Sequence, residues 1–383
     1  MLPFLMPCGA SPALLAQGLE AAVRQEACTP LADEQPLWRV LLLRMPQGKM
    51  AIVLTIHHCI GDGSFIATML MKELLTSAPP SSSSPSSSPS TAPSTTPSAP
   101  ASAAAATWPA ACMMLLSQPA AWLLQARSVL VGKQLRVGRE APLSLGRSAT
   151  IEIGAGSDVG AIRRATGATV TDILLAAFAA CVRSVELRAS SRSSRSAPHV
   201  APLLTFMPAM AGSPDVTAPL ERHTGNTVSG YMLSLPADDP SPLGRLRNVR
   251  RQSGAAKAAR IATVAGWLAR VALRLAPRQL LPQLVPLSAH VASCCGVSSF
   301  RGPPTSAIDG ATLDAFYFYG LFTPPRMPLM VAFTSVGERL RVTLVMKGGL
   351  AGTKDVADVL HELPHALNEL PCARATARVT KDA

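Results

Sequence analysis

The alternation of apolar and polar positions predicts a short hairpin early in the chain, followed by a helix. Residues 37–43 and 50–56 are apolar runs of strand length, and the proline and glycine within 46–48 indicate a turn between them. Apolar side chains then recur at helical spacing over residues 64–75, where Ser64 can cap the first turn. We therefore expect a strand, a turn, a second strand and a helix, in that order.

The rest of the chain mixes helical and strand patterns. The clearest helix is expected at residues 171–186, where apolar residues recur every four positions from Ile173 to Val185 and Asp172 suits the N-terminus. Further strands are expected at residues 203–207, 227–235, 312–319, 330–334 and 340–346, and a closing helix at 353–370. Such an order favours a mixed chain, α/β or α+β, with an N-terminal lobe at residues 1–150 and a C-terminal lobe at 151–383.

Three segments depart from these patterns. Residues 78–107 are all Ala, Pro, Ser or Thr, so burial cannot offset the entropy of ordering them, and a disordered insert is expected. Residues 188–199 combine Arg with Ser, which favours an exposed loop; a phosphorylation patch is the weaker alternative. Residues 113–131 are apolar but interrupted by polar side chains and a proline, which favours a buried or interfacial helix over a membrane span.

The charge balance narrows the class of partner. The chain of 383 residues has 35 Lys and Arg against 23 Asp and Glu, a formal charge of +12, with only 15% charged residues. A basic balance suits either nucleic acid or an anionic membrane surface. Aromatic residues make up only 4%, and no zinc-ligand or RNA-binding signature is present, so nucleic acid is not expected and a membrane or acyl substrate is favoured.

The cysteines and the first residues bear on the compartment. The eight cysteines form no C-x-x-C pair, which favours reduced thiols in an intracellular protein. The apolar start lacks the basic region of a secretory signal, so no cleavable signal is expected.

The strongest chemical signal is His-His-Cys-Ile-Gly-Asp-Gly at residues 57–63, between the second strand and the helix. Consecutive strand residues point to opposite faces, so His57 and His58 cannot both enter one cavity, and one is a catalyst candidate while the other is structural. A neutral imidazole can accept a proton from a hydroxyl or thiol. Asp62 lies at the helix start, where the dipole favours its charge, and Gly63 permits a tight bend or close approach of substrate.

Two other interpretations of this motif are less favoured. The pair could be ordinary structural histidines beside an Asp-Gly turn. It could also bind a metal, but adjacent histidines are poorly spaced for shared zinc ligation and no nearby residues complete a set of four. No metal is therefore expected.

The motif resembles the His-His-x-x-x-Asp-Gly signature of the CoA-dependent acyltransferase superfamily, in its wax ester synthase/diacylglycerol acyltransferase branch. Further segments similar to that branch are Pro36-Leu37-Trp38, Gly225-Asn226-Thr227-Val228 and Ser298-Ser299-Phe300-Arg301-Gly302-Pro303. Two positions differ from the branch: Thr171 stands before Asp172 where an Asn-Asp pair is usual, and Ser299 replaces an Asn.

The resemblance implies two chloramphenicol-acetyltransferase-like lobes with a tunnel between them, and a first lobe that is N-terminally truncated. It implies transfer of a long-chain acyl group from acyl-CoA to diacylglycerol or a fatty alcohol, with acyl-CoA as substrate and no cofactor. In that scheme His58 is the general base, His57 is supporting and Asp62 is mainly structural, while Pro36, Leu37, Trp38, Asp172, Gly225 and Asn226 support substrate binding. The expected location is an endoplasmic reticulum membrane or lipid-droplet surface. A non-catalytic lipid-surface protein of the same fold is the alternative.

A second possible site is a basic helix. Arg270, Arg274 and Arg278 recur at four-residue steps beside apolar residues, a pattern that suits a helix lying on anionic lipid. The other interpretation is the solvated face of an ordinary helix shortened by Pro277.

Overall fold

The computed structural model of the protein describes most of the second lobe and the hairpin that precedes it. The residues it describes are 18–19, 21–23, 25–26, 29, 31, 34–45, 48–63, 66, 118–133, 147–153, 159–192, 200–210, 228–277, 279, 295–300, 302, 307–308, 311–319, 327–346 and 356–370.

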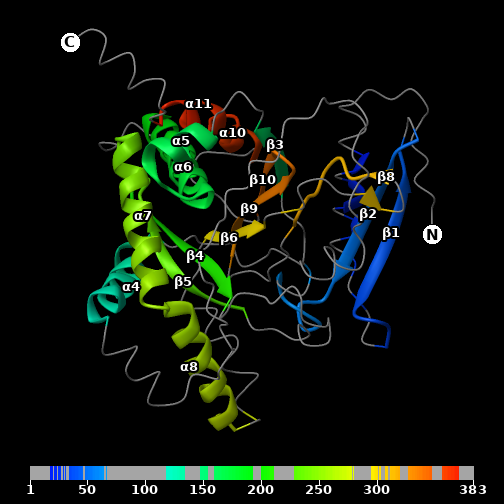
Figure 1. The fold of residues 1–383 in the computed structure, drawn as a ribbon, viewed down its shortest axis with the longest axis horizontal. Coiled ribbons are helices and arrows are strands. Elements are labelled where there is room, and N and C mark those ends of the chain that lie inside the picture. The colour runs from blue at the N-terminus through cyan, green and yellow to red at the C-terminus, as the bar shows by residue number, and fades with distance from the viewer. Residues whose placement is uncertain are drawn as a thin grey trace, which may run out of the picture.

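A six-stranded mixed sheet forms the centre of the larger part (Figure 1). In spatial order its strands are β3 (Arg147–Ile153), β10 (Arg339–Met346), β9 (Leu329–Val336), β6 (Cys295–Phe300), β4 (Leu203–Met210) and β5 (Val228–Leu235). The pairs β9–β6 and β6–β4 are parallel, and the three outer pairs are antiparallel. Parallel neighbours require long crossover connections. The one from β4 to β6 contains β5 and two helices within residues 242–275, whereas the one from β6 to β9 contains the short strands at 307–308 and 311–312.

Helix α6 (Val170–Arg192) is the core helix of this part, because Leu174, Leu175 and Phe178 are completely buried. The helices packed around it are α5 (Val159–Thr166), α7 (Pro242–Ala258), α10 (Val356–Leu360) and α11 (Leu363–Asn368). Two more helices, α4 (Pro119–Val131) and α8 (Ile261–Leu275), pack on β5. The mixed α/β class expected from the sequence is confirmed.

The second unit is an antiparallel hairpin of β1 (Trp38–Arg44) and β2 (Met50–Ile56), which Figure 1 shows apart from the large sheet. Its turn contains Gly48 at φ +70°, a left-handed conformation that glycine adopts without strain. Two short strands, β7 (Ala307–Ile308) and β8 (Ala311–Thr312), form a ladder of their own. Lys49 Nζ donates to Asp314 Oδ2 at 2.9 Å and so links the hairpin to the segment after β8.

Most of the expected strands are confirmed with small shifts of their ends, but three expectations are wrong. Of residues 312–319, Thr312 ends the short strand β8 and residues 313–319 have no regular secondary structure. The closing helix is divided into α10 and α11, because Pro364 lies in the first turn of α11 and cannot continue a preceding helix. Residues 188–192 belong to α6 instead of a loop, and Arg188 is fixed there by an ion pair with Glu362.

Some expectations lie outside the described residues. They are the insert at 78–107, residues 193–199, residues 113–117 and nearly all of the helix at 64–75. Within that last range Ile66 is described and is helical, as is Gly63 just before it. Strands β3 and β6 and helices α5 and α7 were not expected from the sequence.

Within the described ranges, no single helix combines the length and apolar character needed to cross a membrane. Helices α5 and α6 meet that criterion only as a pair bent by 107°, on length and composition alone.

Candidate active site

The His motif lies where the hairpin ends and a helix begins, as its sequence context predicts. The His57 N–H donates to Leu37 O at 2.8 Å, which is the last link of the hairpin, and the Ile60 N–H then closes a turn onto His57 O at 3.1 Å. The Ile66 N–H donates to Asp62 O at 3.0 Å, which is the first helical bond. The motif is therefore held at both ends by backbone structure.

One of the two histidines is oriented by a hydrogen bond within its own turn. The His57 Nδ1 accepts from the Cys59 N–H at 3.2 Å, so that ring is oriented by its own turn. Both imidazoles are exposed, and His58 is therefore accessible to a substrate. The arrangement suits one positioned supporting histidine and one reactive histidine.

The acidic and glycine positions of the motif also differ in burial. Asp62 is completely buried and has partners inside the protein. Gly63 is exposed, and a Cβ atom placed on it would meet no atom within 4 Å. Because its φ is not positive, strain does not explain a glycine at position 63, and the open space there leaves room for a substrate.

The residues Pro36, Leu37 and Trp38 lie next to the end of the motif strand. Leu37 supplies the carbonyl that accepts from His57, and Trp38 begins β1 opposite Ile56 in the register. The Trp38 ring is 53% exposed. The structure thus brings this early segment and the motif together.

Asp172 organises the start of α6 in the second lobe. Its Oδ2 accepts from the Thr169 hydroxyl at 2.7 Å and its Oδ1 accepts from the Ser253 hydroxyl of α7 at 2.7 Å. The carboxylate is buried, and its charge adds to the effect of burial on Tyr231, which raises the pKa of that phenol to about 12. Asp172 is therefore a structural carboxylate at the helix N-terminus.

Thr171 and Ser299 form a contact that the sequence did not reveal. Their hydroxyl oxygens lie 3.0 Å apart and join the start of α6 to β6. These are the two positions where an Asn was expected from the resemblance. Their joint departure was the available signal, although nothing in the sequence says that residues 128 positions apart touch.

The remaining expected site residues lie either outside the described residues or on a helix away from the motif. Gly225, Asn226 and Arg278 lie outside the described residues. Arg270 and Arg274 are exposed on α8, which Figure 1 places at the far end of the second lobe.

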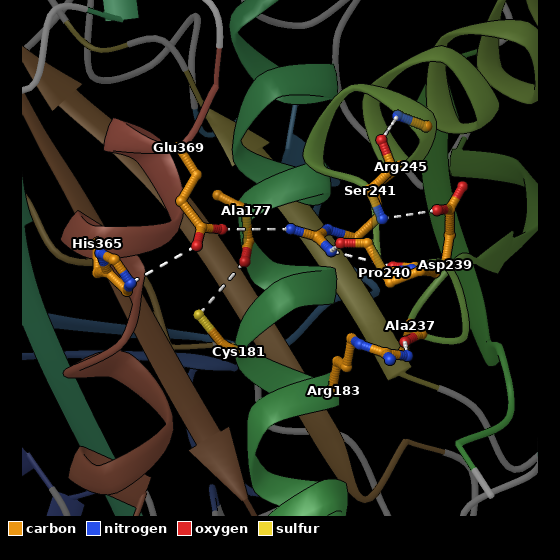
Figure 2. Close-up of polar contacts among 11 residues, drawn as sticks. Ala177, Cys181, Arg183, Ala237, Asp239, Pro240, Ser241, Arg245, His365 and Glu369 are labelled. Carbon is orange, nitrogen blue, oxygen red and sulfur yellow. Dashed lines mark hydrogen bonds and ion pairs between the residues drawn. The ribbon is translucent and has the colours of Figure 1, made fainter.

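A polar cluster behind α6 is structural (Figure 2). Arg245 is 3% exposed, donates to Asp239 O at 3.0 Å and pairs with Glu369 at 3.6 Å, so it fastens α7 to the end of α11. Cys181 donates to Ala177 O at 3.3 Å, and burial raises the pKa of its thiol, with the charge of Glu362 adding to that effect. A protonated, buried thiol is not a nucleophile.

Among the described residues, no group of three or more His, Cys, Asp or Glu side chains could hold a metal ion.

Two models of one protein family match most of the chain. The wax ester synthase/diacylglycerol acyltransferase catalytic domain matches residues 10–174, and the C-terminal domain of the same family matches residues 224–370. Two strains of Mycobacterium tuberculosis each have a protein, provisionally named diacylglycerol O-acyltransferase, that is 25% identical over 248 residues. The match covers 62% of this chain and 50% of each relative, so the chain spans about half the length of these relatives.

Solved structures agree at the level of the fold. The wax ester synthase/diacylglycerol acyltransferase of Marinobacter aquaeolei VT8 superposes with a TM-score of 0.53 at 19% identity, covering 93% of this chain and 76% of that one. The epimerization domain from the third module of tyrocidine synthetase B gives 0.52 at 14% identity, covering 92% and 76%. The two family models and the shared fold together show that this chain belongs to the wax ester synthase/diacylglycerol acyltransferase family.

Proposed function

We propose that the protein is an O-acyltransferase that moves a long-chain acyl group from acyl-CoA to the hydroxyl of diacylglycerol or a fatty alcohol. The observation that carries this proposal is the exposed His58 in a turn fixed at both ends, within a chain of an acyltransferase family. The proposed products are triacylglycerol or wax ester.

The chemistry needs one base and no added cofactor. The neutral His58 imidazole accepts the proton of the acceptor hydroxyl while the hydroxyl oxygen forms a bond to the thioester carbonyl carbon. The tetrahedral intermediate then expels the CoA thiolate, which takes the proton back from the imidazolium. His57, oriented by the Cys59 N–H, supports the turn, and the buried Asp62 holds the start of the following helix.

The proposed substrates follow from the relatives. The mycobacterial proteins are named for diacylglycerol, and the Marinobacter protein is named for both acceptors. Both acceptors dissolve in membranes, so we propose an intracellular location at the endoplasmic reticulum membrane or a lipid-droplet surface.

The test is acyl transfer by the full chain from a labelled long-chain acyl-CoA, with diacylglycerol and a long-chain alcohol offered in parallel. His58→Ala should lower the rate by about 10²- to 10⁴-fold, the usual worth of a general base. His361→Ala is the matched control, because that histidine is exposed in the second lobe and distant in sequence from the motif. Full activity in His58→Ala would overturn the proposed role.

A second candidate is a non-catalytic lipid-surface protein of the same fold. It is favoured by the exposed Arg270 and Arg274 on α8, which suit a lipid surface and need no chemistry. A chain with a cooperative melting transition that forms neither ester would support this candidate over the enzyme.

A further inference from the structure

The helices that pack on the edge strand β5 share an unusual charge composition. Helices α4, α7 and α8 have 13, 17 and 15 residues, and none of the three contains Asp or Glu. Their basic residues are Arg127 on α4, Arg245, Arg247, Arg250, Arg251 and Lys257 on α7, and Arg270 and Arg274 on α8. We call the outer side of these three helices the basic helical face.

The inner sides of α4 and α7 are fixed to β5, which leaves their other sides outward. The Gln125 Oε1 accepts from the Met232 N–H at 2.7 Å, and the Gln252 Oε1 accepts from the Ser234 N–H at 2.9 Å. These glutamines satisfy backbone groups that an edge strand would otherwise leave unpaired. The two helices therefore cannot turn their basic sides inward.

Apart from the buried Arg245, the basic side chains of these helices have no acidic partner among the residues that the structure describes. Arg247, Arg251 and Lys257 are exposed on α7, and Arg270 and Arg274 are exposed on α8. Among the ion pairs of the described residues, Arg245 is the member of these helices that has an acidic partner, and it is buried. The exposed charges therefore give this face a positive electrostatic potential that a negatively charged partner can approach.

Large apolar side chains are exposed on the same helices. Leu123 and Leu130 on α4 are 70% and 84% exposed, and Leu275 at the end of α8 is 78% exposed. Figure 1 shows the last turns of α8 extending beyond the sheet. Leucines in water contribute nothing to stability, but they gain free energy when they enter an apolar layer.

We infer that the basic helical face docks on an anionic lipid membrane. Phosphate headgroups complement the arginines, and the acyl layer accepts Leu130 and Leu275; nucleic acid would satisfy the charges but not the leucines. This inference rests on the proposed function, because docking would bring the protein to acceptors that are dissolved in the membrane.

The test is flotation of the full chain with vesicles of phosphatidylcholine alone or mixed with phosphatidylglycerol. The chain should bind the mixed vesicles and lose binding as salt rises. The double variant Arg270→Glu with Arg274→Glu should lower the affinity for the mixed vesicles by about tenfold or more. Leu275→Ser should weaken binding without changing its salt dependence.

The matched control is Arg163→Glu with Arg164→Glu, which makes the same charge change on α5. Both arginines are exposed, and Figure 1 places α5 at the opposite end of the lobe from α8. Equal losses in the two double variants, or equal binding to neutral and anionic vesicles, would overturn the inference. Melting curves check that each variant is folded.

Two further measurements separate this inference from the proposed function. His58→Ala should float with anionic vesicles as the unaltered chain does, even where it forms no ester, so binding and chemistry fail independently. Duplex DNA should compete weakly for the chain. The lipid inference is wrong if DNA binds the chain more tightly than the vesicles do and the Arg270→Glu, Arg274→Glu variant loses its binding to DNA. The face would then be a nucleic-acid surface.

Discussion

Asp62 shows how burial divides the roles within seven consecutive residues. Its carboxylate is completely buried, whereas His57 and His58 on the same turn are exposed. A buried polar group is retained when its partners are inside the protein, and Asp62 has such partners. His58 is exposed and so accessible to a substrate, while the buried aspartate belongs to the turn that presents it.

Asp62→Ala should therefore cost stability as well as activity. Removing a buried group leaves its partners unsatisfied, at about 1–3 kcal/mol, so the midpoint of urea unfolding should fall. His58→Ala, at an exposed position, should lower acyl transfer and leave that midpoint within about 0.5 kcal/mol of the parent. An Asp62→Ala chain with parental stability and no activity would instead assign the aspartate a direct chemical role.

At the scale of single residues, the sequence predicted those features of the site that neighbouring residues form. The motif and its position between a strand and a helix could be found because seven neighbouring residues and two local patterns specify them. The contact of Thr171 with Ser299 could not be found, because it depends on how α6 packs against β6. Burial of Asp62 also depends on packing that composition does not report.

Helix α6 is fixed within the second lobe through hydrogen bonds of its first turn. Asp172 and Thr169 bond to each other there, since the Asp172 N–H donates to the Thr169 hydroxyl and the Thr169 hydroxyl donates to Asp172 Oδ2. Ser253 adds a bond from α7. The same turn contains Thr171, so the position of the Thr171–Ser299 contact depends on this cap.

Asp172→Ala should destabilise the chain by about 2 kcal/mol, from about 1 for the cap and about 1 for the bond to Ser253. Ser253→Ala removes the second contribution alone and should cost about half as much. Urea unfolding of the two variants and the parent gives both values. Equal losses would mean that the cap itself adds nothing.

Most elements were predictable from periodicity, and the two large-sheet strands that were missed share a cause. Strands β4 and β9 and the second half of β10 are mainly apolar, and α6 is apolar from Ile173 to Val182. Strand β3 alternates polar side chains, including Arg147 and Glu152, and β6 has three small residues, so neither has a strong apolar signal. The end of α6 was mistaken for a loop because Ser and Arg there are held by packing against the C-terminal helices, including the Arg188–Glu362 pair.

The arrangement of the whole molecule was the least accessible to sequence reasoning. Two lobes were expected, and the structure shows a hairpin apart from a six-stranded sheet. The strand order of that sheet pairs β3 with β10, nearly 190 residues later, which no local pattern encodes. The hairpin that ends in the His motif and the second lobe are likewise joined by residues far apart in the chain, Lys49 and Asp314.

The Lys49–Asp314 ion pair should link the hairpin to the second lobe less strongly in acid and in high salt. The hydrogen bond from Lys49 lowers the pKa of the Asp314 carboxyl, and the charge of Lys49 adds to that effect. Because the folded pKa lies below the unfolded value of about 3.9, the pair stabilises the fold fully above that pH. The contribution is lost as pH falls through the lower, folded value. Both side chains are more than half exposed, so the contribution is about 0.2–1 kcal/mol and is screened by salt.

Lys49→Ala should return the Asp314 pKa toward its ordinary value, which NMR titration of the carboxyl carbon measures directly. The same variant should speed amide exchange in β1 and β2 more than in β9 and β10, because the ion pair holds the hairpin and not the large sheet. Lys257→Ala, on the outer side of α7, is the control for loss of one positive charge. An Asp314 pKa that stays low without Lys49 would assign the shift to Arg339 and Arg341, the more distant charges, and would leave the hairpin without this electrostatic link to the second lobe.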